Sequence, residues 1–368
     1  MRISAAVVRE PEGKFTIEEL ELDGPGPGEV LVEIHSVGVC HTDIGVRNQW
    51  LPFPMPAVLG HEGAGVVSEV GEGVDTVAPG DKVVLTYNSC GQCPTCNGGE
   101  PAYCINFLGS NFAGSRLDGT NALKGTDGSA VGAYYFGQSS FATHAIATVR
   151  NVVKMPEATD LNLVGPLGCG IITGAGTVFN TFNPKPEQTV AVFGSGAVGL
   201  SAVMAAKVVG CRAIVAVDRV PARLELAKEL GATHTINTND VEDVPGAVRE
   251  ATGMGADFAV DTTAVPAVMK ATVSSLAPRG TAGLLGLGVA GTEFSVDMLE
   301  LAVPGRKVVG VIEGDADPHA LIPRIAELQL EGRFPFEKLI KAYPFDQINQ
   351  AVEDSDTGLT LKPVLTLN

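Results

Sequence analysis

Short runs of alternating hydrophobic and polar residues characterise the first half of the chain. Up to about residue 160, stretches such as Val30–Ile34 and Gly65–Val70 are rich in β-branched residues, which favours strands. Turn residues separate these stretches, as at Pro25–Gly28 and Pro79–Asp81. No helical period is sustained over this part of the chain. The pattern therefore predicts a β-rich unit with irregular loops.

From about Val190 the pattern changes to strands that alternate with helices. The apolar runs Thr189–Phe193 and Ala213–Val217 predict buried parallel strands, and Leu200–Val209 predicts the helix between them. Further strands are expected at 257–261, 281–285 and 307–311, with helices at 265–276 and 318–331. Alternation of this kind predicts an α/β fold with a doubly wound parallel sheet.

A glycine motif joins the first of these strands to its helix. The G-x-G-x-x-G motif contains Gly194, Gly196, Ala197, Val198 and Gly199. Asp218 ends the next strand, 19 positions after the last glycine, and this context completes a dinucleotide-binding fingerprint. The glycines let the backbone approach a pyrophosphate at the helix N-terminus. Asp218 is expected to bind the ribose hydroxyls and repel a 2′-phosphate, which favours NAD, although a cation at Arg219 would help NADP.

Composition and charge narrow the class of protein. A chain of 368 residues with 45% hydrophobic and 18% charged residues is expected to be globular and to form two domains. Its formal charge of −17 argues against nucleic-acid binding, which requires a basic surface. The uncharged stretch Gln188–Ala206 is explained by a strand and a buried helix, and no secretory signal is expected, so no membrane partner is predicted.

Cysteine spacing gives the most specific chemical signal. The chain has seven cysteines, and four of them are close together: Cys90, Cys93, Cys96 and Cys104. Four thiolates at this spacing fit a closed, structural zinc site that holds a long loop together. A disulfide framework and an iron–sulfur cluster are the alternatives. Thiols used for metal binding, without an export signal, indicate a cytoplasmic protein.

These motifs together resemble those of the zinc-dependent medium-chain alcohol dehydrogenases, over nearly the whole chain. Besides the cysteines and the glycine motif, the matching pieces are Gly38–Asp43, Gly60–Gly65 and Gly168–Gly170. Within that family, Asn88–Gly91, Phe136–Phe141 and Gly165–Gly170 resemble the bacterial aryl-alcohol and geraniol-type branch. The resemblance implies a β-rich, GroES-like catalytic domain (1–170 and 312–368) and a Rossmann coenzyme domain (171–311).

The resemblance also implies a catalytic metal site. Cys40, His61 and Cys169 correspond to three zinc ligands that leave the fourth position open to substrate. Glu62 corresponds to a carboxylate that approaches the metal during exchange, with a salt-bridged carboxylate beside the site as the alternative. Asp43 corresponds to the residue that orients the zinc-bound imidazole.

The proton route is implied in part. Thr42 matches the hydroxyl that receives the substrate proton, and it is equally suited to cap a helix. The animal enzymes have a histidine at the position of Gly45, so His41 either takes over that histidine's duty or contacts the coenzyme pyrophosphate. Neither choice follows from the sequence alone.

Further contacts with coenzyme and substrate follow from the resemblance. Thr173 matches a hydroxyl at the nicotinamide, and Arg223 matches a basic residue near the adenosine ribose. Lys362 resembles a cation that reaches the coenzyme phosphates, with an ordinary surface lysine as the alternative. The candidates for the wall of the substrate pocket are Trp50, Leu51, Tyr87, Tyr135 and Phe136.

The expected protein is a zinc-dependent, NAD-dependent alcohol dehydrogenase that oxidises primary aryl or allylic alcohols to aldehydes reversibly. It would hold one catalytic and one structural zinc ion per chain and form a homodimer or homotetramer. One alternative is a dehydrogenase of S-(hydroxymethyl)thiols, which needs cations for the carboxylates of the thiol, and residues 45–60 offer only Arg47. Another alternative is a non-catalytic nucleotide-binding protein.

Overall fold

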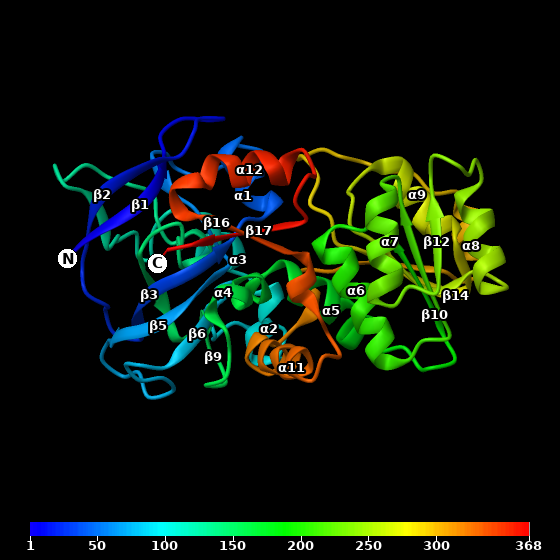
Figure 1. The fold of residues 1–368 in the computed structure, drawn as a ribbon, viewed down its shortest axis with the longest axis horizontal. Helices are drawn as coiled ribbons and strands as arrows, with labels where there is room; N and C mark the ends of the chain where they lie inside the picture. The colour runs from blue at the N-terminus through cyan, green and yellow to red at the C-terminus, as the bar shows by residue number, and fades with distance from the viewer. Residues whose placement is uncertain (368) are drawn as a thin grey trace. The chain divides into compact units, whose positions relative to one another are not determined.

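The computed structural model describes residues 1–367 and divides into two compact units. Unit 1 comprises Met1–Gly170, Asp317–Glu327 and Glu337–Asn368, and unit 2 comprises Ile171–Ala316 and Leu328–Phe336. Unit 1 is rich in strands and unit 2 alternates strands with helices (Figure 1). The change from a β-rich to an α/β pattern predicted from the sequence is therefore confirmed.

Two sheets build unit 1. The larger sheet has the order β16-β17-β3-β5-β6-β9, and β8 also pairs with β3. Its strands are β3 (Glu29–Gly38), β5 (Gly63–Val70), β6 (Lys82–Leu85), β8 (His144–Thr148), β9 (Val152–Lys154), β16 (Ile340–Pro344) and β17 (Lys362–Thr366). The smaller sheet has the order β4-β1-β2-β7, with β1 (Arg2–Val8), β2 (Thr16–Leu22), β4 (Ala57–Val58) and β7 (Leu123–Gly125). Strand β3 is central because it pairs with β5, β8 and the C-terminal strand β17.

The following helices of the β-rich part are short. They are α1 (His41–Arg47), α2 (Pro94–Asn97), α3 (Phe107–Phe112), α4 (Leu161–Val164) and α12 (Ile348–Asp356). Helix α11 (Pro318–Leu330) is the helix predicted at 318–331. Sequence analysis did not predict α12, in which only one face is buried.

Unit 2 contains a six-stranded parallel sheet in the order β12-β11-β10-β13-β14-β15. The strands are β10 (Thr189–Phe193), β11 (Ala213–Asp218), β12 (His234–Asn237), β13 (Ala256–Asp261), β14 (Leu276–Leu284) and β15 (Lys307–Gly310). The helices are α5 (Gly170–Gly176), α6 (Ala197–Val209), α7 (Pro221–Leu230), α8 (Val244–Thr252), α9 (Pro266–Ser274) and α10 (Met298–Ala302). Helices α6 and α7 contact each other, as do α8 and α9, and the two pairs cover opposite faces of the sheet (Figure 1). This strand order is that of a dinucleotide-binding fold.

Two predicted boundaries in unit 2 differ from the structure. The predicted helix 265–276 ends at Ser274, and β14 begins at Leu276 rather than at residue 281. Strand β12 was not predicted because it lies at the sheet edge, where only Ile236 of its four residues is buried. The uncharged stretch Gln188–Ala206 forms β10 and most of α6, as predicted.

Among the described residues, no single helix has both the length and the apolar character needed to cross a membrane. One bent pair, Leu161–Gly168 with Gly170–Phe182, meets the criterion by length and composition only.

Candidate functional site

Helix α1 places Cys40 at its N-terminus. Cys40 is the N-cap and has extended backbone angles (φ −116°, ψ 154°), and its N–H donates to Oδ2 of Asp43 at 2.8 Å. The N-cap position therefore belongs to Cys40 and not to Thr42, so the alternative role of Thr42 as a helix cap is wrong. A cysteine at a helix N-terminus is favoured as a thiolate because the backbone N–H groups stabilise negative charge.

The second oxygen of Asp43 holds the imidazole of His61. Asp43 Oδ1 accepts a hydrogen bond from His61 Nδ1 at 2.8 Å and another from the Gly60 N–H at 3.3 Å. With Nδ1 as the donor, Nε2 carries the lone pair of the ring. This Nε2 is buried and has no hydrogen-bond partner among the described residues. A buried nitrogen of this kind is costly unless a ligand such as a metal ion binds it.

Four side chains of unit 1 converge on one point. Cys40, His61, Glu62 and Cys169 each bring one candidate ligand atom within 4.8 Å of the others. A hydrogen bond from Cys169 and the nearby charge of Lys362 hold the pKa of the Cys40 thiol well below its ordinary value, against the opposing effect of burial. Thiolate sulfur and imidazole nitrogen are the donors that zinc prefers. The donor set and the unpartnered His61 Nε2 therefore fit a zinc ion.

Glu62 is held by a cation from the other end of the chain. Lys362 Nζ lies 2.9 Å from Oε1 and 3.0 Å from Oε2 of Glu62, and it also donates to the carbonyl of Val39 at 3.3 Å. The Gly170 N–H donates to Glu62 Oε1 at 3.1 Å. Burial raises the pKa of Glu62, and the charge of Lys362 opposes this effect. The salt-bridged alternative for Glu62 thus describes this structure, and Lys362 is buried rather than a surface lysine.

The residues predicted for the proton route lie beside Cys40. Thr42 Oγ1 is 3.7 Å from Cys40 Sγ, and the side chain of His41 is exposed. A Cβ added to Gly45 would lie 3.0 Å from Cε3 of Trp50. The indole therefore occupies the space that a larger residue at position 45 would need.

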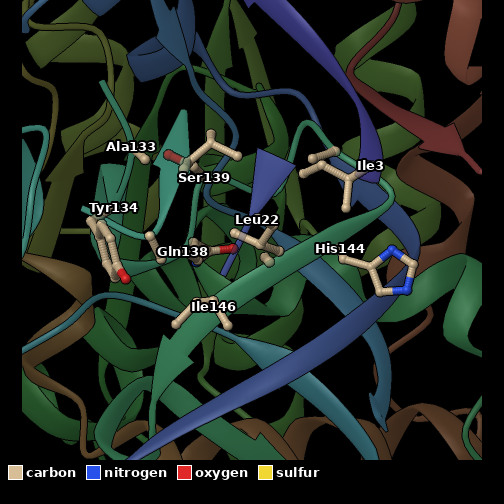
Figure 2. Close-up of a pocket in the computed structure, with 12 residues that line it drawn as sticks. Ile3, Leu22, Ala133, Tyr134, Gln138, Ser139, His144 and Ile146 are labelled. Atoms are coloured by element: carbon tan, nitrogen blue, oxygen red, sulfur yellow. The ribbon is translucent and has the colours of Figure 1, made fainter. Parts of the chain in front are cut away.

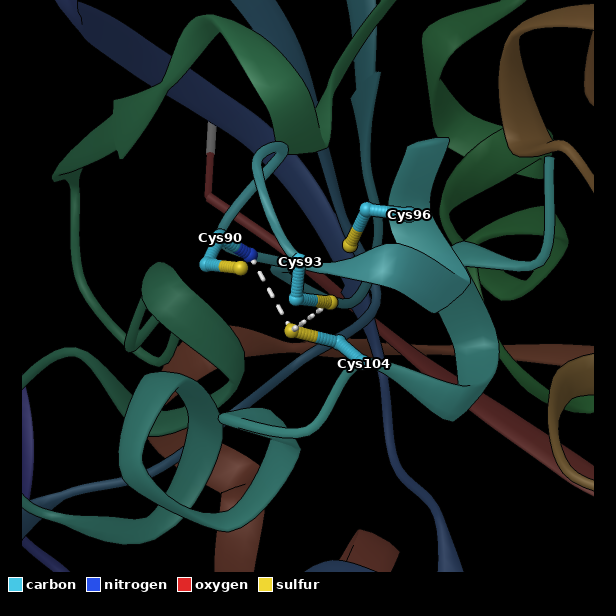
Figure 3. A group of neighbouring side chains, drawn as sticks. All are labelled: Cys90, Cys93, Cys96 and Cys104. Carbon is cyan, nitrogen blue, oxygen red and sulfur yellow. Dashed lines mark hydrogen bonds between the residues drawn. The ribbon is translucent and has the colours of Figure 1, made fainter. Parts of the chain in front are cut away.

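The four remaining ligand candidates form a second cluster. The Sγ atoms of Cys90, Cys93, Cys96 and Cys104 lie within 4.8 Å of one another. Figure 3 shows the four side chains pointing toward one another. Hydrogen bonds from the Thr95 hydroxyl and the Cys96 N–H lower the pKa of Cys93 to about 5. Burial raises the pKa of Cys104 to about 12. A cation is therefore needed to hold all four sulfurs as thiolates, and this requirement fits a closed zinc site.

The glycine motif of unit 2 has the tight geometry expected of a phosphate loop. Gly194 has a φ of +92°, which favours glycine. A Cβ at Gly199 would collide with the carbonyl oxygen of Gly194. The Asp218 carboxylate accepts from the Ser195 N–H at 2.6 Å and from the Val220 N–H at 2.9 Å. These bonds fix Asp218 against the loop.

Three other residues of unit 2 were predicted to contact the coenzyme, and they lie before or after this motif in the sequence. Thr173 Oγ1 donates to Glu313 Oε2 at 3.4 Å, and Glu313 was not predicted to contribute to a site. Arg219 is exposed and Arg223 is partly buried. All three residues belong to unit 2, whereas the predicted coenzyme contacts Lys362 and His41 belong to unit 1.

The proposed pocket residues divide into exposed and buried ones. The side chain of Trp50 is 45% exposed and Leu51 is partly buried, whereas Tyr87, Tyr135 and Phe136 are buried. The ring of Phe136 stacks on His61 at a centroid distance of 4.4 Å, and the ring of Tyr135 meets His61 edge-on at 5.3 Å. Two of the five candidates therefore contact a proposed metal ligand directly.

Sequence reasoning did not single out Gln138. Its side-chain amide donates to the carbonyls of His61 and Thr86, at 2.9 Å and 3.1 Å, and accepts from the Gly63 N–H at 3.1 Å. Gln138 lies within a stretch quoted only for its family resemblance, and nothing in its spacing indicates a contact with residues about 75 positions earlier in the chain.

Comparison with known proteins identifies two family matches. Residues 26–157 match the alcohol dehydrogenase GroES-like domain, and residues 197–327 match the zinc-binding dehydrogenase family. Together the two matches cover more than half of the chain.

Individual relatives match over the whole length. The chain is 44% identical over 362 residues to a geraniol dehydrogenase from Castellaniella defragrans, covering 98% of this chain and 96% of the relative. The solved structure of an alcohol dehydrogenase zinc-binding domain protein from Burkholderia ambifaria superposes with a TM-score of 0.98 at 49% identity. The match covers 100% of this chain and 99% of the other. The benzyl alcohol dehydrogenase of Acinetobacter calcoaceticus superposes with a TM-score of 0.97 at 43% identity, covering 100% of both chains.

Proposed function

Because this chain belongs to the zinc-dependent medium-chain alcohol dehydrogenases, we propose that it oxidises primary aryl or allylic alcohols to aldehydes, reversibly, with NAD as the hydride acceptor. The observation that carries the proposal is the convergence of Cys40, His61 and Cys169 around a buried nitrogen without a partner. The same chain contributes a fixed aspartate at the end of the second strand of a dinucleotide fold. The cluster and the fold serve hydride transfer between an alcohol and a nicotinamide.

The substrate class rests on relatives and on side-chain chemistry. One relative is named for geraniol, an allylic alcohol, and one structural neighbour for benzyl alcohol. The rings of Tyr135 and Phe136 pack against His61, and large apolar side chains beside the proposed metal site suit substrates with a flat apolar group next to the hydroxyl.

The mechanism assigns each residue near the cluster a separate duty. Cys40, His61 and Cys169 would hold the zinc ion, which supplies a Lewis acid that lowers the pKa of an alcohol. Asp43 keeps the proton of His61 on Nδ1 and so leaves Nε2 available as a ligand. The Thr42 hydroxyl would act as a relay, accepting the hydroxyl proton of the alcohol while it releases its own proton to the next group. His41, whose side chain is exposed, is our candidate for the group that passes this proton on to solvent.

The proposal also includes a structural metal site and a homo-oligomeric state. Cys90, Cys93, Cys96 and Cys104 would hold a structural zinc ion, which gives two zinc ions per chain. A homo-oligomer in the cytoplasm remains our prediction for the protein in the cell.

Coenzyme choice is expected to depend on Asp218. Replacing Asp218 by Ser removes a charged acceptor for the ribose hydroxyls and the repulsion of a 2′-phosphate. Because hydrogen bonds to charged groups contribute roughly 1.5–3 kcal/mol, we expect kcat/KM for NAD to fall about tenfold or more while that for NADP rises. Steady-state kinetics with both coenzymes measure the ratio. Asp240→Ser is the matched control, because Asp240 is an exposed aspartate of unit 2 that accepts from Asn237 Nδ2 at 2.8 Å. An unchanged ratio in Asp218→Ser would show that Asp218 does not select the coenzyme.

A rate profile with four substrates tests the proposed function. Benzyl alcohol and geraniol with NAD are expected to exceed ethanol clearly in kcat/KM. S-(hydroxymethyl)thiol adducts are expected to be poor because residues 45–60 offer only one cation, Arg47, for the carboxylates of the thiol. An ethanol-led or flat profile would overturn the substrate class, and a profile led by the thiol adducts would favour the alternative dehydrogenase.

A further inference from the structure

We propose that Gln138 is a positioning residue that sets the relative placement of the metal-ligand candidates His61 and Cys169. The inference rests on the proposed function, because it takes both residues as ligands of the catalytic zinc. In this proposal the segment Tyr134–Ser139 positions the metal ligands, in addition to any part that it has in lining a substrate pocket.

The Gln138 amide spans the backbone on both sides of Glu62. Its NH2 group donates to the carbonyl of His61 at 2.9 Å, and its oxygen accepts from the Gly63 N–H at 3.1 Å. The side chain is 2% exposed, so water does not compete for these bonds. The turn that carries His61 and Glu62 is thereby fixed from outside its own strand, because an amide with all its groups satisfied adopts a single orientation.

Thr86 links the same amide to the segment that carries Cys169. Its second N–H donates to the carbonyl of Thr86 at 3.1 Å. The hydroxyl of Thr86 in turn donates to the carbonyl of Gly168 at 2.7 Å, and Gly168 directly precedes Cys169. A chain of two side chains therefore connects the backbone of one ligand to the backbone next to another, although the ligands lie over 100 positions apart in the sequence.

The local backbone around Gln138 is strained. Tyr134, Phe136 and Ser139 have φ values of +57°, +52° and +54°, which L residues rarely adopt. The structure maintains this conformation with further bonds, since Asn151 Nδ2 donates to the carbonyl of Gly137 at 3.1 Å and Ser139 Oγ donates to that of Val58 at 2.7 Å. Strain held in place by its surroundings occurs preferentially at functional sites.

The same strained segment makes a second contact with His61. Phe136 stacks on the imidazole of His61, with an angle of 21° between the rings. The segment therefore holds His61 at its ring through Phe136 and at its backbone through Gln138. Asp43 bonds Nδ1 of the same ring, so the orientation of the ring is fixed from two sides.

The space around Gln138 allows a residue of similar shape to replace it without a steric clash. Figure 2 shows Gln138 and Ser139 at the wall of a small cavity, together with Ile3, Leu22 and His144. The cavity has a volume of about 20 Å³. Methionine has nearly the shape of glutamine, and this space allows small adjustments without a collision.

Zinc exchange in the Gln138→Met variant tests the inference. Zinc release to a chromophoric chelator should show two phases in the unsubstituted protein, one for each metal site. Residues that orient metal ligands typically change metal affinity or activity by about 10- to 100-fold. We therefore expect the phase of the catalytic site to accelerate by about tenfold or more in Gln138→Met, while the phase of the four-cysteine site stays unchanged. We also expect kcat to fall and KM for NAD to remain the same.

A matched control and a second variant keep the outcome decisive. Gln350 is an exposed glutamine of unit 1 that donates to Asp354 Oδ1 at 2.7 Å, so Gln350→Met should lose one hydrogen bond without changing either phase. Gln138→Glu keeps the acceptor toward Gly63 and removes both donors, and it should accelerate the same phase. Wild-type release rates in both Gln138 variants would overturn the inference. Release of only one zinc from the unsubstituted protein would instead overturn the proposed function.

Discussion

The Cys40→Ser variant is expected to lose turnover by at least about a thousandfold while it still binds NADH. Serine replaces a thiolate by a neutral hydroxyl, which is a poor ligand for zinc at neutral pH. A Lewis acid contributes several kcal/mol to stabilising developing charge, and each 1.36 kcal/mol corresponds to a factor of ten in rate. NADH binding should persist because the glycine motif and Asp218 lie in unit 2, whereas Cys40 lies in unit 1.

Three measurements on this variant separate the possible outcomes. Metal analysis should find two zinc ions per chain in the unsubstituted protein and about one in Cys40→Ser. Fluorescence titration should give a similar Kd for NADH in both proteins. Cys211→Ser is the matched control, because Cys211 is buried in unit 2 and belongs to neither cluster. Retained turnover in Cys40→Ser would remove Cys40 from the site.

The sequence predicted those parts of the site whose signal is local. Cys90, Cys93, Cys96 and Cys104 are close along the chain, and the structure brings their sulfur atoms together. Asp43 follows Cys40 by one helical turn, so its bond to the Cys40 N–H is encoded in the same few residues. The strand, glycine loop and helix at 189–209 were likewise predicted from consecutive positions.

The parts that the sequence did not predict depend on contacts between distant segments. The ion pair of Glu62 with Lys362 joins residues 300 positions apart, and no pattern in either segment indicates the other. Gln138 was overlooked for the same reason, since its function lies in hydrogen bonds to backbone groups far away in the sequence. The resemblance suggested Phe136 as a wall of the substrate pocket, whereas its stack on His61 becomes visible only in three dimensions.

The Lys362→Met variant is expected to destabilise unit 1 by about 3–5 kcal/mol, because removal of one partner of a buried ion pair leaves the other charge uncompensated. Lys362 and Glu62 are 4% and 0% exposed at their side chains, so water cannot replace the lost partner. Glu62→Gln should be costly for the same reason. Replacement of both residues by neutral groups of similar shape is often nearly neutral. The Glu62→Gln, Lys362→Met double variant should therefore be much less destabilised than the sum of the single variants.

Denaturant unfolding measures this coupling directly when all variants are in the same metal state. The chain has a single tryptophan, Trp50, and it lies in unit 1, so its fluorescence reports the unit that contains the ion pair. Lys341→Met is the matched control, since the side chain of Lys341 is 55% exposed in its pair with Asp354 and such pairs contribute at most about 1 kcal/mol. Strictly additive effects in the double variant would mean that Glu62 and Lys362 are stabilised independently, and Lys362 would then be free to act on another anion, such as a coenzyme phosphate.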